Sequence, residues 1–192
     1  MSEATARVIE SIEVDGLELH QVHPVDGTSL RQVCGMFVTG VTVITAEGAG
    51  EAIGTTVNSF TSVSLDPPLV LFCLHRGSRL APMVRDGGSF VVNFLAGRQE
   101  QVAWAFAGRK PAALENVGYC RSSIGTPVLT DALSFLVCRL VNEFDGGDHL
   151  IFLGEVVELG VPRHRREPLV FFGGAMGALE QETPTTYPAW EG

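Results

Sequence analysis

Two long apolar segments joined by one glycine-rich turn place the strongest limit on how this chain can fold. Residues 133–143 (LSFLVCRLVNE) and 150–159 (LIFLGEVVEL) are rich in β-branched and aromatic residues, and the linker FDGGDH lies between them. Segments of this composition favour strands, and a short linker with two glycines favours a hairpin. The sequence therefore predicts a long antiparallel pair of strands.

Further strands are expected in the rest of the chain. VTVITA (41–46) ends at a glycine-rich turn and has AIGTTV (52–57) as its hairpin partner; the other expected strands are LVLFCL (69–74), SFVVNFL (89–95) and PLVFFGG (168–174). LVLFCL is apolar throughout, which is typical of a strand buried on both faces. Since there is no strand–helix–strand rhythm and no G-x-G-x-x-G motif, a closed antiparallel barrel fits better than a doubly wound sheet.

Two or three short helices complete the expected elements. One begins at Thr28 or Ser29 and has a single apolar face, formed by Leu30, Val33, Cys34 and Phe37. A second is capped by Ser78 and runs through Val84. A third covers residues 98–107 and has Val102, Ala103 and Phe106 on its inner face. We expect an N-terminal arm at 1–27, one domain at 28–178 and an extended tail at 179–192.

Composition excludes several classes of function. The net charge of −9 argues against binding to nucleic acid and to anionic membranes. The chain has no signal-peptide pattern and no apolar run of the length that spans a bilayer, so a cytoplasmic protein is expected. The four cysteines lack the C-x-x-C spacing of a zinc site, so no metal is expected. Cys34, Cys73 and Cys138 lie in apolar runs, and we predict buried free thiols in a reducing compartment.

An unusual polar cluster lies between residues 55 and 64, where six of ten residues carry hydroxyl groups and none is charged. Asp66-Pro67-Pro68 follows and forces the chain to leave this loop in an extended form, directly into LVLFCL. Buried hydroxyls need partners, and an unmade hydrogen bond costs about 1–3 kcal/mol. Two interpretations remain: a turn satisfied by its own backbone, or a wall of neutral donors and acceptors for a planar, uncharged ring such as isoalloxazine.

An ordered series of motifs between residues 28 and 178 resembles a known family. The series contains GVTVIT (40–45), GTTVNSFTSVSLDPPL (54–69), Ser78, FVVNFL (90–95), Gln101 to Phe106, GTPVL (125–129), Gly147-Asp148-His149, Pro168-Leu169 and Gly173-Gly174. In this order the motifs resemble the short-chain flavin reductase family, the reductase components of two-component flavin-dependent monooxygenases. The whole series is far more specific than any one motif.

The resemblance implies a mainly β fold: an antiparallel, Greek-key split β-barrel of the FMN-binding type that forms a homodimer. It also implies an NAD(P)H:flavin oxidoreductase, with NADH favoured over NADPH, which reduces FMN or FAD and supplies the reduced flavin to a partner monooxygenase. Two alternatives stay open. The flavin is tightly bound and passes electrons to a bound substrate, or the protein is a non-catalytic flavin-binding barrel.

The resemblance also assigns residues to flavin. They are Gly40, Val41, Thr55, Thr56, Val57, Asn58, Ser59, Ser62, Ser64, Ser78, Arg79 and Asn93. Thr55 to Ser59 would line the ring and ribityl chain, while Ser78 and Arg79 would bind the phosphate at a helix start; Arg76 is a weaker candidate. The alternative for Arg79 is a solvated surface charge. Relatives often carry a further hydroxyl residue where this chain has Leu80-Ala81-Pro82, which leaves the choice between FMN and FAD open.

The nicotinamide side of the site rests on the Gly-Asp-His motif. His149 is the candidate catalytic residue, with Asp148 orienting it or closing the turn, and Gly174 is a further candidate near the nicotinamide. Without the family, His149 is equally an exposed histidine in a turn. Hydride transfer needs the two reacting atoms held about 3–3.5 Å apart, so a residue that fixes the nicotinamide ring is enough. The other histidines show no metal-ligand spacing.

Overall fold

The computed structural model describes residues 11–14, 17–21, 25–48, 50–108, 113–162 and 166–179. The chain divides into two compact units, residues 1–37 and 38–192. Nearly all of the predicted C-terminal tail lies outside the described residues. Each unit is described by itself below.

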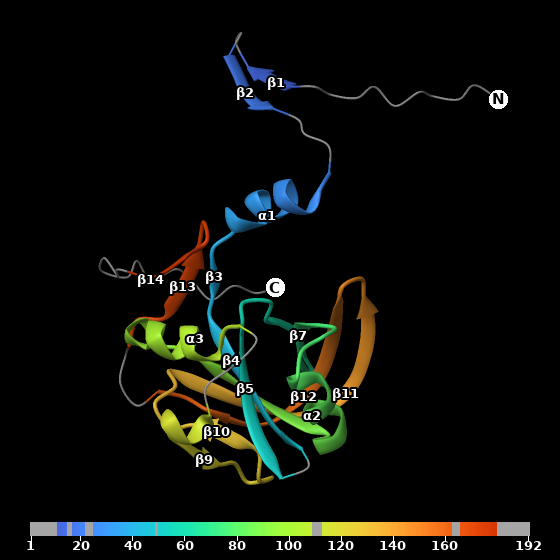
Figure 1. Cartoon of the computed structure of the whole chain (residues 1–192), viewed down its shortest axis with the longest axis vertical. Helices are drawn as coiled ribbons and strands as arrows, with labels where there is room; N and C mark the ends of the chain where they lie inside the picture. Colours follow the sequence, from blue (N-terminus) through green and yellow to red (C-terminus); the bar gives the residue numbers. More distant parts are fainter. Residues whose placement is uncertain are drawn as a thin grey trace, which may run out of the picture. The chain divides into compact units, whose positions relative to one another are not determined.

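The first unit contains a hairpin and a helix (Figure 1). Strands β1 (Ser11–Val14) and β2 (Leu17–Gln21) pair antiparallel, and helix α1 spans Gly27–Gly35. Asp26 caps α1, because its carboxylate accepts the backbone N–H groups of Thr28 and Ser29 at 2.7 and 3.0 Å. The prediction that Thr28 or Ser29 is the cap was therefore wrong by two or three residues, because the carboxylate of Asp26 accepts both free N–H groups.

The second unit is built on one seven-stranded antiparallel sheet, in the order β5-β4-β8-β11-β12-β7-β6 (Figure 1). Its strands are β4 (Thr42–Gly48), β5 (Glu51–Val57), β6 (Thr61–Leu65), β7 (Pro68–His75), β8 (Ser89–Phe94), β11 (Ser134–Gly146) and β12 (His149–Gly160). The predicted hairpins β4–β5 and β11–β12 are confirmed. The mainly β, antiparallel fold class is confirmed with them.

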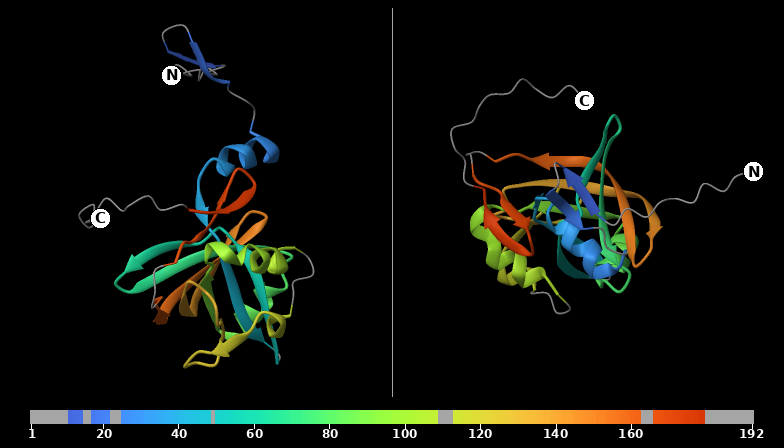
Figure 2. Two further views of the ribbon diagram at one scale, coloured as in Figure 1. Left: turned by 90° about the vertical axis from the view of Figure 1, so that its left-hand side faces the viewer. Right: turned by 90° about the horizontal axis from the view of Figure 1, so that it is seen from above.

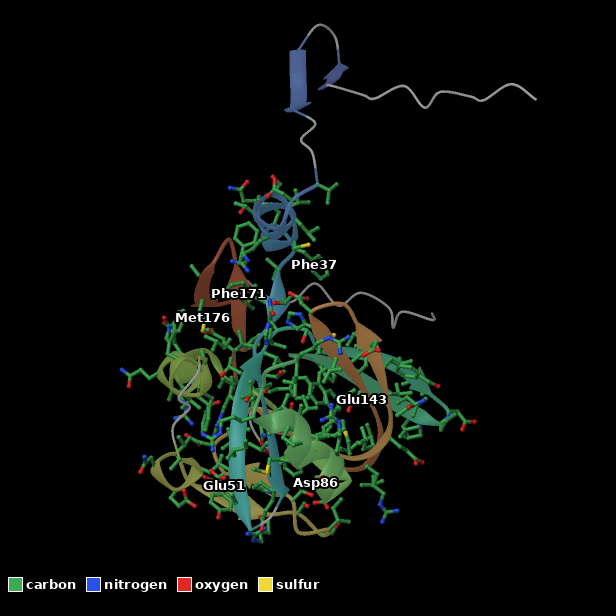
Figure 3. The ribbon with its side chains drawn as sticks, turned by 45° about the vertical axis from the view of Figure 1, so that its right-hand side comes forward. Phe37, Glu51, Asp86, Glu143, Phe171 and Met176 are labelled. Atoms are coloured by element: carbon green, nitrogen blue, oxygen red, sulfur yellow. The ribbon has the colours of Figure 1, made fainter. Side chains whose placement is uncertain are left out.

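Two smaller sheets accompany the large one. β3 (Thr39–Gly40), β13 (Leu169–Phe172) and β14 (Ala175–Ala178) form one, and β9 (Tyr119–Arg121) pairs with β10 (Pro127–Leu129) in the other. β13 was predicted, whereas β14 was not. In the β13–β14 hairpin Phe171 lies opposite Met176 (Figure 3).

Two short α-helices and two 3₁₀ turns complete the second unit: α2 (Leu80–Gly87), η1 (Gly97–Gln99), α3 (Glu100–Phe106) and η2 (Leu114–Asn116). The predicted inner face of α3 is confirmed for Ala103 and Phe106, which are fully buried. The N-cap of helix α2 is Arg79, one residue later than predicted, and Ser78 makes only a 3.3 Å bond to the N–H of Leu80.

The core is organised around three phenylalanines, Phe72 on β7, Phe152 on the adjacent β12, and Phe90 on β8. The ring of Phe72 lies 4.8 Å from that of Phe90 and 5.2 Å from that of Phe152, measured between centroids. Gly154 makes this packing possible, since a Cβ atom there would sit 2.3 Å from Cζ of Phe90. A side chain at position 154 would therefore displace the ring of Phe90.

Part of the hydroxyl-rich segment differs from its prediction as a loop. Residues Thr61–Leu65 form strand β6, which pairs with β7 at the edge of the large sheet, and the Asp66–Pro67 peptide bond in the connecting turn is cis. Threonine and valine favour an extended backbone, so this part of the cluster prefers a strand. Figure 2 shows the β6–β7 hairpin projecting from the rest of the unit.

The cysteines differ in exposure. Cys138 is fully buried, and burial raises the pKa of its thiol to about 12. Cys73 is half-buried, whereas Cys34 and Cys120 are exposed. Of the three cysteines in apolar runs, the prediction of a buried thiol was therefore wrong for Cys34. Within the described residues, no group of three potential ligands is placed to hold a metal ion, and no helix is long and apolar enough to cross a membrane.

Candidate functional site

A cavity of about 760 Å³ brings together most of the residues expected at the site. It lies where β5, β7, β12 and the start of α2 meet. Its walls contain Thr55, Thr56, Val57, Asn58, Ser59, Cys73, Leu74, His75, Gly77, Ser78, Arg79, Gly108 and His149. The flavin-side cluster and the candidate catalytic histidine therefore face one space, although they are far apart in the sequence.

The neutral wall of this cavity is only partly free to bind a ligand. The hydroxyl of Thr56 donates to the carbonyl of Ala103 at 2.7 Å. The hydroxyl of Ser59 accepts the N–H of Cys73 and donates to its carbonyl, at 3.0 and 3.1 Å. Thr55 and Asn58 make no side-chain hydrogen bond within the described part of the chain. Thr56 and Ser59 thus hold the wall in place, and Thr55 and Asn58 are its available donors and acceptors.

His149 is held from two sides at the first position of β12. Its Nδ1 atom lies 2.7 Å from Oδ1 of Asp148, and this bond lowers the pKa of the Asp148 carboxyl. The ring of His75 packs edge-on against it with a centroid distance of 5.6 Å. Since Nδ1 of His149 bonds to a carboxylate, Nε2 is the ring atom left to face a ligand.

His75 was not recognised in the sequence as a site residue. It stands opposite His149 in the β7–β12 register, and its Nδ1 accepts the N–H of Gly77 at 3.1 Å. Because Nδ1 accepts this hydrogen bond, the proton of the neutral His75 ring is on Nε2. No sequence pattern marks this pair, because it depends on which residues of two distant strands lie opposite each other.

Arg76 stabilises the turn that carries His149. Its Nε donates to the carbonyl of Gly147 at 2.5 Å, and its Nη2 donates to Asp145 at 2.8 Å. Its backbone N–H also donates to the carbonyl of Asp148. The role considered for Arg76 at a flavin phosphate therefore does not fit, because its guanidinium is bound to the turn.

The phosphate-side candidates lie at the start of α2. Ser78 and Arg79 both line the cavity. Nη2 of Arg79 is 3.0 Å from Oε1 of Glu51, and both side chains are more than half exposed. Arg79 is thus exposed to solvent and also forms an ion pair with Glu51 at the edge of the cavity.

Asn93 does not fit its expected role at the flavin. Its side chain is fully buried inside the sheet. It donates to the carbonyl of Val43 and to the hydroxyl of Thr45, and it accepts the N–H of Leu129, all within 3.0 Å. With these groups occupied and no exposure, Asn93 joins strands rather than binding a ligand.

The remaining candidates lie outside the main cavity. Ser62 and Ser64 are on edge strand β6, Gly40 ends β3, and Gly174 is in the β13–β14 turn with a φ of 86°. Val41 lines a smaller space of about 220 Å³ that shares Thr56, Val57 and Asn58 with the main cavity and also touches Trp104, Ala107, Phe171 and Met176. Val41 therefore lies on the opposite side of the wall that Thr56, Val57 and Asn58 form.

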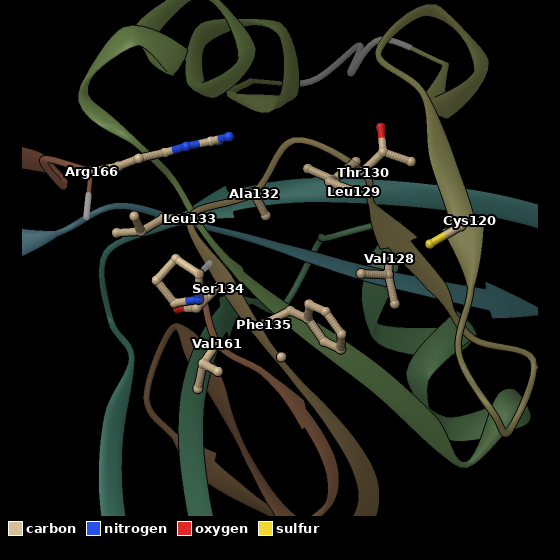
Figure 4. Close-up of a pocket in the computed structure, with 12 residues that line it drawn as sticks. Cys120, Val128, Leu129, Thr130, Ala132, Leu133, Ser134, Phe135, Val161 and Arg166 are labelled. Carbon is tan, nitrogen blue, oxygen red and sulfur yellow. The ribbon is translucent and has the colours of Figure 1, made fainter. Parts of the chain in front are cut away.

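A separate cavity of about 320 Å³ opens elsewhere, between β10 and the adjoining ends of β11 and β12 (Figure 4). Its walls are mainly apolar and include Val128, Leu133, Phe135 and Val161, with Arg166 at one side. It contains none of the residues expected to bind flavin or nicotinamide. This cavity is distinct from the candidate site.

Comparisons with known proteins agree with the architecture of the site. Residues 34–180 match the family described as flavin reductase like domain. The flavin-dependent monooxygenase reductase subunit HsaB of Rhodococcus jostii is 36% identical over 176 residues, which are 92% of this chain and 90% of the relative. The FMN reductase (NADH) SmoA of Agrobacterium fabrum is 35% identical over 91% of this chain and 99% of its own length.

A solved structure is similar as well. The NADH:FAD oxidoreductase of Streptomyces globisporus, in complex with NAD and FAD fragments, superimposes with a TM-score of 0.79 at 37% identity. The match covers 86% of this chain and 99% of that chain. On the matched length, the order of its motifs and this fold, the chain belongs to the flavin reductase like domain family.

Proposed function

We propose that the protein is an NAD(P)H-dependent flavin reductase that supplies reduced FMN or FAD to a separate monooxygenase. The observation that carries the proposal is the shared cavity of about 760 Å³, which has Thr55 and Asn58 on one wall and His149 on another. A non-catalytic flavin-binding protein needs the wall with Thr55 and Asn58 but does not need the wall with His149. The relatives support the proposal because they include FMN-reducing and FAD-reducing enzymes that use NADH.

The cavity residues fit a flavin because they are neutral hydrogen-bonding groups beside one cation. Thr55 and Asn58 bind the polar edge of the ring or the ribityl hydroxyls, while Ser78 and Arg79 bind the phosphate. Ser59 and Thr56 keep the wall rigid through their bonds to Cys73 and Ala103. A preformed wall of this kind loses little conformational entropy when a ligand binds.

The reaction transfers a hydride, which is two electrons and one proton, from the nicotinamide to the flavin, and solvent supplies the remaining proton. The protein's task is to position the two rings and to limit other reactions. His149 positions the nicotinamide through Nε2, and Asp148 keeps Nδ1 engaged. Arg76 and His75 hold this histidine on its turn, so the nicotinamide side is also preformed.

We also propose a homodimer and a cytoplasmic location. Val141, Phe144, Val157 and Leu159 of the β11–β12 hairpin are 52%, 47%, 40% and 61% exposed, which is typical of a surface that another chain covers. The exposed free thiols of Cys34 and Cys120 suit a reducing compartment. Sedimentation at micromolar concentration tests the dimer; an active monomer contradicts it.

Steady-state oxidation of NADH and NADPH with added FMN and FAD tests the function. Turnover should require flavin, and His149→Ala should lower kcat/KM for the nucleotide by about ten- to a hundredfold while the flavin Kd stays within about twofold. No turnover above free flavin in any of the four combinations contradicts the enzyme. Flavin that stays bound through dialysis and is never released to a separate oxygenase favours the alternative, a tightly bound prosthetic group.

A further inference from the structure

Arg79 stands between two spaces on the surface of the second unit. It lines the main cavity and also an adjoining depression of about 290 Å³, which contains Glu51 and Glu115. Glu51 is the first residue of β5 and is labelled in Figure 3. The guanidinium of Arg79 therefore lies at the border between a neutral cavity and an acidic depression.

Arg79 is the single arginine or lysine among the described residues that line the main cavity. The neighbouring Arg76 is bound to Gly147 and Asp145. Within the described part of the cavity wall, Arg79 is therefore the cationic partner that a phosphate would meet. Nη2 of Arg79 already lies 3.0 Å from Oε1 of Glu51, so the phosphate meets a guanidinium that a carboxylate partly neutralises.

We propose that Glu51 determines flavin affinity by competing with the flavin phosphate for Arg79. This inference rests on the proposed function, since it concerns the phosphate of the flavin bound at the same site. Arg79 either leaves Glu51 when a phosphate binds or shares its donors between the two anions. Glu51 thereby weakens the binding of phosphorylated flavin and keeps the flavin exchangeable, which is what a reductase that releases its product requires.

The expected size of the effect follows from the exposure of the pair. Arg79 and Glu51 are 59% and 54% exposed, so water and salt screen their attraction. Glu51→Gln removes the ion pair with Arg79 and also removes a negative charge near the bound phosphate. We expect FMN binding to become about three- to tenfold tighter at low salt. The gain should shrink as ionic strength rises. Riboflavin has no phosphate, so its affinity should not change.

The test is the Kd of FMN and of riboflavin, measured by quenching of flavin fluorescence on the full-length protein without nucleotide. Glu51→Gln keeps the size of the side chain and one acceptor oxygen but removes its charge. The matched control is Glu115→Gln, which removes a charge from the same depression without touching Arg79's ion pair. The third protein is Glu51→Gln in an Arg79→Ala background.

The proposal expects Glu51→Gln to tighten FMN about three- to tenfold and to leave riboflavin within twofold. Glu115→Gln should shift neither ligand beyond twofold, and the Glu51→Gln gain should vanish once Arg79 is alanine. The proposal is overturned by an unchanged or weaker FMN affinity, by an equal gain for riboflavin, or by an equal gain from Glu115→Gln. In those cases the wild-type protein still binds FMN, and the proposed function stands. A wild-type protein that binds no flavin overturns both.

Discussion

Two asparagines that the sequence placed at the same flavin should behave in opposite ways. Asn93 is fully buried and makes three hydrogen bonds that join β8 to β4 and β10. Asn58 is exposed at the cavity wall and makes none within the described residues. Replacing each by alanine therefore separates the stability of the sheet from the binding of ligand.

Asn93→Ala removes the side-chain acceptor of the buried N–H of Leu129 and one donor to the carbonyl of Val43, which stays in the β4–β8 ladder. A buried group without a partner costs about 1–3 kcal/mol, so the free energy of unfolding should fall by about 1–3 kcal/mol. This is a large part of the 5–15 kcal/mol that is typical of a domain. Urea denaturation followed by circular dichroism measures the loss, and the flavin Kd of the folded fraction should stay within about twofold.

Asn58→Ala should do the reverse. Unfolding free energy should change by less than about 0.5 kcal/mol, as is usual for an exposed residue, while the flavin Kd rises about five- to a hundredfold. Thr45→Val is a milder test of the buried network if Asn93→Ala fails to fold, and it should also leave flavin affinity intact. An Asn93→Ala protein with wild-type stability and weakened flavin binding would refute the reasoning and return Asn93 to the flavin site.

Three further outcomes follow from the geometry. Arg76→Ala should raise KM for the nucleotide about five- to tenfold with flavin Kd unchanged, because the turn bearing the histidine loses two side-chain bonds. Cys138 should resist iodoacetamide at pH 8 in the native protein while exposed Cys120 reacts, as mass spectrometry can show, because a pKa of about 12 keeps the buried thiol protonated. Gly154→Ala should lower unfolding free energy by about 1–3 kcal/mol, and adding Phe90→Leu should recover part of it, since the new Cβ meets the Phe90 ring at 2.3 Å.

Elements with long, regular patterns were predictable from the sequence. The segment 133–143 and its partner 150–159 correspond to β11 and β12, and 89–95 corresponds to β8. Strand β14 was missed because its sequence AMGA contains no β-branched or aromatic residue, and it is held as a strand by pairing with β13. Pairing with β13, and not the local preference of its residues, therefore makes β14 a strand.

The composition of the site was predictable, but the direction of its side chains was not. Thr55 to Ser59, Ser78, Arg79 and His149 do line one cavity. Whether a residue on a strand faces a ligand or the core depends on a register that changes with a shift of one residue, so the sequence could not reveal that Asn93 is buried inside the sheet. Partners such as His75 and Glu51 come from other strands, and no local pattern reveals them.

The two walls of the cavity are joined by contacts between distant parts of the chain, and this has a consequence for folding. Arg76 and Gly147 are 71 residues apart in sequence, and the β7–β12 pairing that brings them together closes a loop of similar length. Non-local pairing slows folding, since the entropy of a long loop is lost before the contacts form. A growing chain on the ribosome has no nicotinamide wall until β12 has emerged. Nicotinamide binding during refolding should therefore appear only after β12 has paired with β7.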